Sequence, residues 1–572
     1  MAVTNADIAA VFEEMADLLD IQGENPFRVR AYHNAARSVQ GLSRSLAEMV
    51  AAGEDLQALP AIGKDLAEKI REIVRTGRLR KLKELERAVS PDLAALLEIP
   101  GIGPRRVRIL HEQLDIDNVA ALEKAARAGR IRTLPGFGAT SEANILKGLT
   151  EAQQRARRYL WSEVEPVATE LADYLKAVDG VKQVAVAGSY RRRRETLGDL
   201  DILATAASSE AIMQRFVRYE DVERVISQGS TRSTVVLHRG LQVDLRVVPV
   251  VSFGAALHYF TGSRAHNIAV RARAVRKGLK INEYGVFRGE KRIAGKTEKE
   301  VFATVGLPYI EPELRENRGE LEAASKRQLP KLISEADIRG DLHMHTEETD
   351  GHDSLETLVT AARKKGYAYV AITDHSQHLT VAKGLTAERL LRQCEAIDRL
   401  NESLSDIRIL KGLEVDILED GHLDLEDDVL AQLDVCVGAV HSAFGLSQRR
   451  QTARIIRAMD NRYFNILAHP TGRLLGKRRA YDLDVEKVIA AAAERGCFLE
   501  VNCQPERLDL NDVDCALAKS MGVKLAISTD AHSGAQLDYM RFGIAQARRG
   551  WLEKNDVLNS LSLKALLRLL KR

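Results

Sequence analysis

Two aspartates set two positions apart, Asp199 and Asp201, are the clearest chemical signal in the first half of the chain. They open an apolar run, and residues two apart in a strand project from the same face. Two carboxylates on one face repel each other unless cations lie between them. A pair of Mg²⁺ ions about 3.5–4 Å apart is a common arrangement for phosphoryl or nucleotidyl transfer. The spacing therefore predicts a metal site, which Asp244 of a neighbouring run would complete.

A glycine and a serine precede this pair. The backbone of Gly188 and the hydroxyl of Ser189 offer donors to a triphosphate, and Arg192 offers a positive charge. A solvated turn is the alternative, and it would explain the arginine run from 191 to 194. It would not explain why an Asp-x-Asp pair opens an apolar strand, so the sequence favours a nucleotide site.

Residue types that bind metals follow or end six apolar runs after residue 340. They are His343 with His345, His375, Glu414, His441, His469, and Asp530 with His532. A lone histidine is more often a satisfied surface or core residue, but six strand ends that each deliver His or Glu indicate a metal cluster. Mixed imidazole and carboxylate ligands suit Zn²⁺, Mn²⁺ or Fe²⁺ better than Mg²⁺.

The first 150 residues are the part of the chain that we expect to hold DNA. Their apolar residues recur at spacings of three and four, which predicts helices throughout. Three turns of the form apolar-Pro-x-apolar-Gly interrupt them, at 59–63, 99–103 and 134–138. We expect their glycines to bring backbone N–H groups to a DNA phosphate, although ordinary helix–helix turns are the alternative. The glycines are Gly63, Gly101, Gly103, Gly136 and Gly138.

The aspartates and the histidine-rich set described above lie beside apolar runs that we expect to be strands of two separate sheets. Short β-branched runs begin near Val181 and predict a mixed sheet with strands over 184–187, 201–205, 234–237 and 243–251. A charged stretch follows, and we place a linker at 316–336. Beyond it, apolar runs alternate with helical segments, which predicts a parallel barrel with its site at the carboxyl ends of the strands. The runs are 369–373, 436–440, 464–468, 498–502 and 525–529.

Composition bounds the class of protein. The 572 residues exceed a single core, and no 18-residue apolar run indicates a membrane span. The first residues resemble no secretion signal, and the five cysteines form no CxxC pair, so we expect a cytoplasmic, nucleoid-associated enzyme without disulfides. The net charge of +3 does not exclude nucleic-acid binding, which needs only a local basic surface.

The motifs of the first half resemble the family X DNA polymerases, of which DNA polymerase beta is a member. The similarity runs from about residue 1 to 315 and includes Gly-Ser-x-Arg-Arg at 188–192, Gly-Asp-x-Asp at 198–201, Val-Asp-Leu-Arg at 243–246 and Tyr-Phe-Thr-Gly-Ser at 259–263. The resemblance implies that Asp199, Asp201 and Asp244 bind Mg²⁺ or Mn²⁺, with Asp244 assisting attack by the primer 3′-hydroxyl. It implies nucleotide-binding roles for Gly188, Ser189, Arg192, Gly198, Tyr259, Phe260, Gly262, Asn267 and Arg271.

The chain departs from the family pattern at several positions. Arg264 stands where polymerase beta has an acidic residue, Arg193 replaces a glycine, and Leu197 replaces a serine. These changes bear on substrate affinity more than on the reaction. Lys69 occupies the position of the family's Schiff-base lysine in deoxyribose-phosphate lyase chemistry. Asp65 nearby would favour the protonated lysine, so a lysine that only touches phosphate or solvent is the alternative.

The histidine motifs resemble the polymerase and histidinol phosphatase (PHP) domain over about residues 337 to 572. The resemblance implies two or three Mn²⁺, Zn²⁺ or Fe²⁺ ions on nine ligands: His343, His345, Asp350, His375, Glu414, His441, His469, Asp530 and His532. His352 competes with Asp350 for one role, whereas His378 and His422 match nothing and are expected in solvent. Arg473 would bind a substrate phosphate or lie at the surface.

These resemblances divide the chain into six parts. The fold class is multi-domain, with a helical helix-hairpin-helix N-terminal region, an α+β nucleotidyltransferase palm and thumb, and a C-terminal α/β distorted (β/α)7 PHP barrel. We expect a lyase-like helical domain at 1–85, a helix-hairpin-helix subdomain at 86–150, the palm at 151–250, a nascent-base-pair subdomain at 251–315, the linker at 316–336 and the PHP domain at 337–572.

The expected function is DNA repair. The enzyme would be a monomer that fills short gaps in gapped or nicked duplex DNA with dNTPs. Its PHP domain would hydrolyse 3′ ends as a 3′-5′ exonuclease, an AP endonuclease or a 3′-phosphatase/phosphodiesterase. One alternative is a metal-dependent phosphoesterase that uses the first half only to hold DNA. Another is a non-catalytic scaffold, which would predict gaps in the carboxylate and histidine sets, and the sequence shows none.

Overall fold

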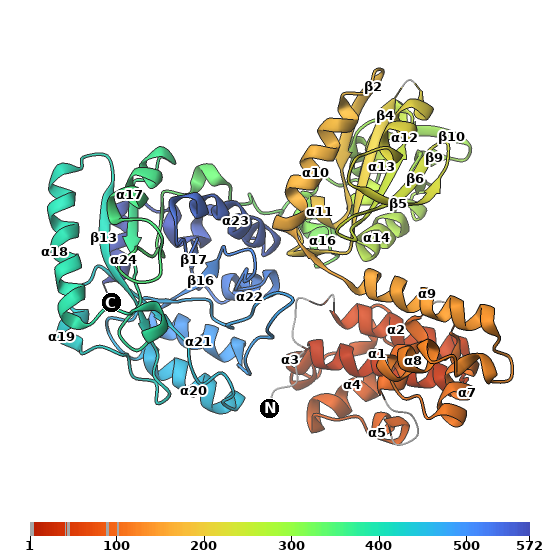
Figure 1. Ribbon diagram of the computed structural model, residues 1–572, viewed down its shortest axis with the longest axis horizontal. Coiled ribbons are helices and arrows are strands. Elements are labelled where there is room, and N and C mark those ends of the chain that lie inside the picture. Colours follow the sequence, from red (N-terminus) through yellow and green to blue (C-terminus); the bar gives the residue numbers. More distant parts are fainter. Residues whose placement is uncertain are drawn as a thin grey trace. The chain divides into compact units, whose positions relative to one another are not determined.

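The computed structural model describes residues 5–40, 42, 46–86, 91–99, 102–206 and 208–571. The chain forms two compact units. The first comprises 1–158 with 239–241 and 316–319, and the second comprises 159–238, 242–315 and 320–572. Figure 1 labels the helices and strands of both.

The first unit is helical, as its apolar spacing predicts. Its helices are α1 (Asn5–Ile21), α2 (Pro26–Gln40), α3 (Leu46–Ala51), α4 (Lys64–Thr76), α5 (Arg80–Glu86), α6 (Pro91–Ala94), α7 (Pro104–Leu114), α8 (Val119–Arg127) and α9 (Ala139–Ala156). The apolar stripe of α1, including Ile8, Phe12 and Met15, is fully buried against the other helices. Burial of such stripes supplies most of the stability of short helices.

The second unit begins with a five-stranded mixed sheet that α10 (Trp161–Lys176) and α12 (Ser209–Val217) flank. The order is β2-β4-β7-β6-β5, and β4 and β7 are its parallel pair. The strands are β2 (Val181–Val186), β4 (Asp199–Ala206), β5 (Val222–Gln228), β6 (Arg232–Leu237) and β7 (Gln242–Val247), and β1 (Tyr159–Leu160) pairs separately with β3 (Thr196–Leu197).

One prediction about this sheet was wrong, and one of its strands was not predicted. The strand expected over 243–251 ends at Val247, because Pro249 has no N–H for a sheet and a 3-10 turn over Val250–Ser252 follows. The sequence did not reveal β5, an edge strand whose residues are almost all exposed and therefore lack an apolar alternation.

A smaller helical and β-sheet part follows. It contains α13 (Phe253–Thr261), α14 (Arg264–Val275), a sheet of β8 (Lys280–Asn282), β9 (Gly285–Arg288) and β10 (Lys291–Ala294), and α15 (Glu298–Thr304). The expected linker at 316–336 is not extended throughout, because α16 (Glu320–Ser325) lies within it. Glu320 is fully buried and lies 2.6 Å from the ring of His266. Its charge suggested exposure, but a tertiary partner buries it.

The C-terminal part is a seven-stranded, all-parallel, nearly closed barrel. Its strands are β11 (Gly340–Asp341), β12 (Tyr369–Ile372), β13 (Arg408–Asp416), β14 (Val435–Ala439), β15 (Ile466–Leu467), β16 (Phe498–Asn502) and β17 (Leu525–Ser528), paired in chain order. A parallel bridge between Met344 and Ala531 brings the two ends of the sheet together. The predicted distorted (β/α)7 barrel is confirmed.

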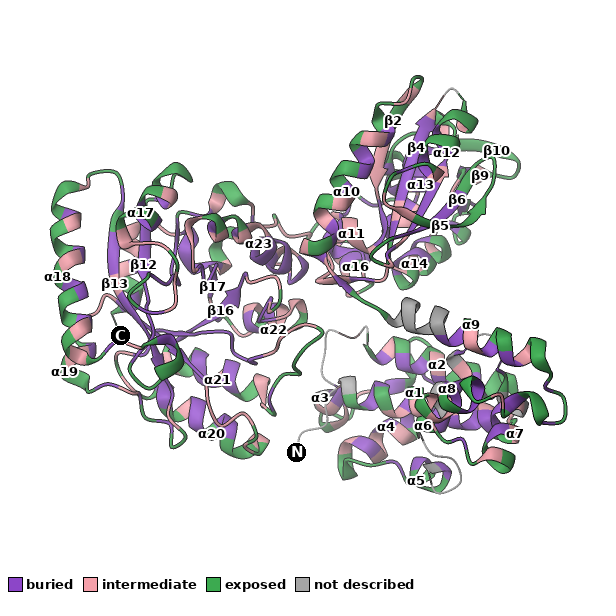
Figure 2. Cartoon of the chain, viewed as in Figure 1, coloured by how far each residue is buried: buried purple, intermediate pink, exposed green. Residues whose placement is uncertain are grey.

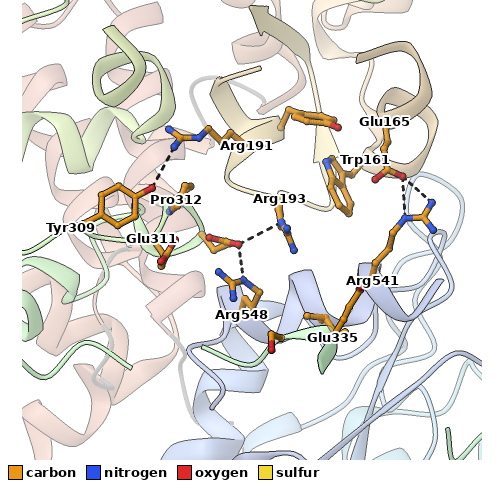
Figure 3. Close-up of a pocket in the computed structure, with 14 residues that line it drawn as sticks. Trp161, Glu165, Arg191, Arg193, Tyr309, Glu311, Pro312, Glu335, Arg541 and Arg548 are labelled. Carbon is orange, nitrogen blue, oxygen red and sulfur yellow. Dashed lines mark hydrogen bonds and ion pairs between the residues drawn. The ribbon is translucent and has the colours of Figure 1, made fainter. Parts of the chain in front are cut away.

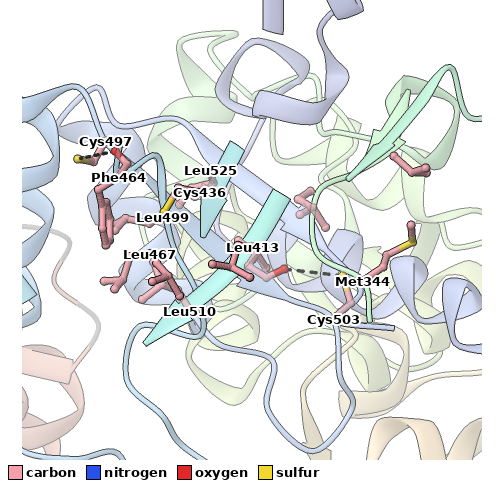
Figure 4. Packing of buried hydrophobic residues seen from close by; sticks show 14 of the residues in the cluster. Met344, Leu413, Cys436, Phe464, Leu467, Cys497, Leu499, Cys503, Leu510 and Leu525 are labelled. Atoms are coloured by element: carbon pink, nitrogen blue, oxygen red, sulfur yellow. Dashed lines mark hydrogen bonds between the residues drawn. The ribbon is translucent and has the colours of Figure 1, made fainter. Parts of the chain in front are cut away.

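Helices cover the outside of the barrel. They are α17 (Leu355–Lys364), α18 (Ala387–Ser403), α19 (Asp427–Leu430), α20 (Gln448–Met459), α21 (Val485–Arg495), α22 (Asp512–Ser520) and α23 (Met540–Arg549). The last helix, α24 (Leu563–Leu570), packs against the other face of the strands, in a separate cluster with residues such as Tyr369 and Leu410. Figure 2 shows the barrel strands buried and the outer faces of the helices exposed. Apolar residues of both layers, such as Leu413, Phe464 and Leu499, pack between them (Figure 4). All five cysteines are buried, and none of them forms a disulfide with another described residue. Within the described residues, no helix is long and apolar enough to cross a membrane.

Candidate active sites

Three carboxylates meet on the five-stranded sheet. Asp199 and Asp201 lie on β4, and Asp244 lies on the parallel strand β7 directly opposite Asp201. The alternation of side chains along a strand puts all three on one face. The sequence predicted that Asp199 and Asp201 share a face and named Asp244 as the third carboxylate, and the strand register places Asp244 beside Asp201.

The three carboxylates differ in their surroundings. Burial and the nearby charges of Asp199 and Asp244 raise the pKa of Asp201 to about 7. Burial also raises the pKa of Asp244, but hydrogen bonds outweigh it and hold that pKa below the usual value. The Thr234 hydroxyl donates to Asp244 at 2.6 Å and the Gln242 amide at 2.9 Å. A like-charge set of this kind fits divalent cations, which relieve the repulsion that raises the pKa of Asp201.

The Gly188 turn lies against these carboxylates. Gly188 has φ +63°, and a Cβ there would lie 2.5 Å from Asp201 Oδ2. Only glycine fits so close an approach. Ser189 follows in α11 (Gly188–Arg191), and Gly198 stands half-buried directly before β4. Arg192 Nη1 donates to the backbone carbonyl of Thr261 at 2.7 Å.

The C-terminal end of α13 forms the other side of this site. Asn267 is buried, and its amide donates to the carbonyls of Tyr259 at 2.6 Å and Gly262 at 3.1 Å. A Cβ on Gly262 would lie 2.5 Å from Asn267 Oδ1. Arg271 lies 6.0 Å from the Tyr259 ring. Asn267 therefore fixes the turn, and its contact with a base pair stays a prediction.

Glu414 is the centre of the histidine cluster in the barrel. Its Oε2 lies 3.4 Å from His343, 3.6 Å from His345 and 2.8 Å from His375. Its Oε1 lies 3.4 Å from His441 and 2.9 Å from His469. One carboxylate in contact with five imidazoles is placed to bridge cations.

The remaining expected ligands surround this centre. Asp530 Oδ1 lies 3.1 Å from His345, and Asp350 Oδ2 lies 3.3 Å from His375 and 3.4 Å from His532. The structure brings together all nine residues that the sequence singled out. His352 is exposed, so Asp350 is the one of the two alternatives that lies in the cluster. His378 and His422 are exposed, as expected.

The donors of the cluster fit metal ions. His343 and His345 are fully buried, and within the described part of the chain His343 Nε2 and both ring nitrogens of His345 make no hydrogen bond of acceptable geometry. Buried polar atoms without partners are costly unless something else binds them. In each of three groups of residues, the ligand atoms lie within 4.8 Å of one another. The groups are His345, Asp350, His375 and His532; His343, His345 and Asp530; and His375, Glu414 and His441. The set therefore fits more than one ion.

Carboxylates that sequence reasoning missed hold the imidazoles from behind. Glu500 on β16 is fully buried, and its Oε1 lies 2.7 Å from His343 Nδ1. Its Oε2 accepts from the backbone N–H of His469 at 2.7 Å. Asp416 lies 3.1 Å from His441 Nδ1. Such contacts fix the tautomer and orientation of a metal-binding imidazole. Their positions in buried apolar strands were the only available signal.

The same charges control protonation. Burial lowers the pKa of His375, but the carboxylates of Glu414 and Asp350 outweigh it and raise the pKa to about 10. The carboxylates around His441 likewise outweigh burial and raise its pKa to about 9. Burial and the charge of His375 lower the pKa of His345 to about 4. A divalent cation competes with protons for these nitrogens, so its binding is favoured at higher pH.

The three turns of the helical unit share one local geometry. The N–H of the residue before the last glycine donates to the carbonyl three residues earlier: Ile62 to Leu59 at 3.2 Å, Ile102 to Ile99 at 3.0 Å, and Phe137 to Leu134 at 3.0 Å. Gly63 and Gly103 then cap α4 and α7, and Gly138 precedes α9. Gly136 has φ +80°. Gly101 lies outside the described residues.

Family models match five stretches of the chain between residues 3 and 504. A helix-hairpin-helix domain matches residues 3–79, a SAM-like helix-hairpin-helix tandem 93–151, the DNA polymerase beta palm 160–245, the DNA polymerase beta thumb 256–316 and the PHP domain 341–504. DNA polymerase/3′-5′ exonuclease PolX of Bacillus subtilis (strain 168) is 39% identical over 571 residues, which cover 99% of both chains. The chain belongs to the family X DNA polymerases with a C-terminal PHP domain.

Two other relatives match parts of this family X polymerase. DNA polymerase lambda of Rattus norvegicus is 30% identical over 342 residues, which cover 54% of this chain and 56% of that one. A probable phosphatase of Thermoanaerobacter sp. (strain X514) is 32% identical over 233 residues, which cover 38% of this chain and 89% of that one.

Lys69 and Arg473 of the family X polymerase have partners that bear on their expected roles. Lys69 forms an ion pair with Asp65 one turn earlier. Arg473 was expected at a substrate phosphate or at the surface. It is instead largely buried, with its guanidinium 2.7 Å from the Glu195 carboxylate. The sequence could not show this partner, which lies 278 residues away.

Proposed function

We propose that this family X polymerase fills short gaps in duplex DNA with dNTPs and hydrolyses 3′ ends in its PHP domain, as a DNA repair enzyme. The observation that carries the proposal is the convergence of Asp199, Asp201 and Asp244 on one face beside the Gly188 turn. The name of the Bacillus subtilis relative, which spans the whole chain, supports both activities.

The palm residues have distinct parts in nucleotidyl transfer. Mg²⁺ or Mn²⁺ on Asp199, Asp201 and Asp244 would polarise the α-phosphate and neutralise its developing charge. Hydrogen bonds from Thr234 and Gln242 keep the Asp244 carboxylate ionised, so it could accept the proton that the primer 3′-hydroxyl loses as its oxygen attacks the α-phosphate. Gly188, Ser189, Arg192 and Gly198 would hold the triphosphate, and Tyr259, Phe260 and Gly262 would abut the sugar, with Asn267 and Arg271 toward the base pair.

The barrel cluster supports phosphodiester hydrolysis. Two or three Mn²⁺, Zn²⁺ or Fe²⁺ ions on the nine ligands would supply a hydroxide at neutral pH. Glu414 lies between the imidazoles, and Glu500 and Asp416 hold His343 and His441 in place. A 3′-terminal DNA phosphodiester is the substrate that a polymerase core would deliver, and abasic or phosphorylated ends share its chemistry.

The helix-hairpin-helix turns would hold the DNA backbone. Gly63, Gly103 and Gly138 have negative or extended φ values, and a Cβ on any of them would meet nothing within 4 Å. The fold itself therefore does not require glycine at these positions. Close approach of a phosphate to the N–H groups of the following helix does require it.

A phosphoesterase that uses the polymerase half only to bind DNA is the second candidate. The match of the probable Thermoanaerobacter phosphatase to 38% of this chain favours it. The complete carboxylate set, with the three side chains that donate to Asp244, argues against it.

The ion pair of Lys69 with Asp65 supports a positioning role for that lysine over lyase chemistry.

Primer extension and 3′ degradation on one-nucleotide-gapped DNA, with Mg²⁺ and Mn²⁺ compared, test the proposal. We expect template-directed addition of one nucleotide and a separate metal-dependent loss of 3′ nucleotides. Hydrolysis without any extension would support the second candidate.

A further inference from the structure

Residues 191–195 form a loop shortly after Ser189, and the C-terminal end of this loop contacts side chains of the PHP domain. Arg473 donates to the Glu195 carboxylate at 2.7 and 3.3 Å, and Gln546 donates to the same group at 3.3 Å. Arg549 Nη1 donates to the backbone carbonyl of Arg192 at 2.9 Å. The PHP domain thus contacts both Arg192, which we assign to the triphosphate, and Glu195.

The PHP side chains in these contacts are themselves fixed. Arg549 is 4% exposed and pairs with Asp512 at 2.6 Å. Arg473 also donates to the backbone carbonyl of Arg507 at 3.0 Å and to that of Leu508. Long side chains that their own domain already orders lose little further entropy when they bind a neighbouring loop. They are therefore rigid supports.

The opposite end of the loop is held by the palm and thumb. Arg191 forms a bidentate ion pair with Glu298, with N–O distances of 2.9 and 2.7 Å, and donates to the Thr261 hydroxyl at 2.8 Å. The loop between Arg191 and Glu195 therefore has one anchor in the polymerase core and one in the PHP domain.

The middle of the loop needs this support. Arg193 has φ +54°, a conformation that costs a non-glycine residue free energy unless its surroundings hold it. Its guanidinium lies 5.9 Å from the Trp161 ring and 3.5 Å from Glu313. Glu313 also accepts from Arg548 of α23 at 2.7 Å. Arg193, Glu313 and Arg548 all line a cavity of about 690 Å³. Figure 3 labels Arg193 and Arg548 there.

We propose that Arg473, Arg548 and Arg549 of the PHP domain are positioning residues for nucleotide binding in the palm. They hold residues 188–198, which include this loop, in the conformation that receives the triphosphate. The PHP domain therefore contributes to polymerisation as well as to hydrolysis. The inference rests on the proposed triphosphate role of this loop. It gives the glycine-to-arginine departure at position 193 a structural reason, because the PHP domain takes over what a glycine would provide locally.

Steady-state incorporation on gapped DNA, with the KM for dNTP and kcat measured separately, tests this inference in the full-length protein. The variants are Glu195→Ala, Glu195→Gln and Arg473→Ala, with the double variant Glu195→Ala/Arg473→Ala. The matched control is Arg541→Ala, because Arg541 of α23 pairs with Glu165 of α10 at 2.9 Å and, among the described residues, makes no hydrogen bond or ion pair with residues 191–195. Arg192→Ala tests the loop's own role.

We expect Glu195→Ala and Arg473→Ala each to raise the KM for dNTP about fivefold or more, with kcat and the KM for DNA changed less than about twofold. The double variant should match the single ones, since both remove one contact. Arg541→Ala should leave the KM for dNTP unchanged. Unchanged metal content and 3′ hydrolysis in Glu195→Gln would show that the protein is folded.

Three results would overturn the inference. If Arg192→Ala raises the KM for dNTP but the Glu195 variants do not, the loop binds nucleotide without PHP support. If Arg541→Ala has the same effect as Arg473→Ala, the contacts act by general docking of the domains. If Arg192→Ala also leaves the KM for dNTP unchanged, the triphosphate role of the loop is wrong and the inference fails with it.

Discussion

Asp201 and Asp244 lie opposite each other on parallel strands, yet hydrogen bonds support only Asp244. Asp244 accepts from Thr234, Gln242 and Arg232, whereas burial and the neighbouring carboxylates raise the pKa of Asp201 to about 7. The pair therefore joins an ionised carboxylate to one that cations must keep ionised at neutral pH. This asymmetry suits a site where one carboxylate assists a hydroxyl and both bind metal.

Replacing Asp199 and Asp201 with Ala should remove nucleotide incorporation and leave 3′ hydrolysis intact. The nine barrel ligands belong to another part of the fold, so they do not depend on the palm carboxylates. Gel-based extension and degradation assays on the same gapped substrate measure both activities. Extension that survives in the double variant would show that the palm assignment is wrong.

Glu414→Ala should cost more bound metal than His532→Ala. Glu414 contacts five imidazoles, and the loss of a bridging carboxylate should release more than one ion. His532 lies at the edge of the cluster, 3.4 Å from Asp350. Elemental analysis of purified protein should give two or three Mn, Zn or Fe per chain for the parent. Equal losses in the two variants would contradict a bridging role.

Glu500→Gln should weaken metal binding although Glu500 is not one of the nine ligands. Loss of its charge should leave His343 less basic and less well oriented, which typically costs about 10- to 100-fold in metal affinity. Competition with a chelator measures this affinity directly. Glu506→Gln, which removes an exposed ion pair with Lys477, is the control and should change nothing. Unchanged affinity in Glu500→Gln would show that the contact is only structural.

Gly63→Val and Gly77→Val, at the two ends of α4, should have opposite effects. A side chain at Gly63 meets nothing in the fold, so stability should hold while affinity for gapped DNA falls equally for all sequences. Gly77 has φ +68° at the C-terminal cap, so a side chain there should cost about 1–2 kcal/mol of stability. Thermal unfolding and binding titrations separate the two. Gly103→Val should behave like Gly63→Val.

Salt should weaken the same DNA binding steeply. Each neutralised phosphate of a duplex contributes a slope of about −0.9 to the log affinity against log salt. Titrations of gapped substrates with different sequences should give one common slope, and the Gly63 and Gly103 variants should bind all of them more weakly. A strong preference for one sequence would contradict backbone recognition.

Acid should weaken the part of the fold around Glu298. Burial raises the pKa of Glu298, but Arg191 and Arg315 outweigh it and lower the pKa from 4.5 to about 2. A depressed pKa stabilises the fold at pH above 4.5, and this contribution is lost as pH falls toward 2. Glu298→Gln should cost on the order of 3 kcal/mol at neutral pH, because it leaves buried Arg315 without its charge partner. Denaturant unfolding of both proteins between pH 3 and 7 should show the difference shrinking in acid.

The sequence by itself determined the local chemistry of this protein. The Asp-x-Asp spacing put two carboxylates on one face, and the strand-end motifs named eight of the nine residues of the cluster around Glu414, to which the PHP resemblance added Asp350. Strand and helix periodicity is a local property, so residues such as His343 and Asp530 could be placed at strand ends before any fold was known.

Only the tertiary structure decided the partners of these residues. Thr234 reaches Asp244 because β6 pairs with β7 in that register, and Glu500 reaches His343 across the barrel. The contact of Arg473 with Glu195 joins residues 278 positions apart. Buried charges such as Glu320 read as exposed in sequence, because a charge shows its partner only once the chain has folded around both.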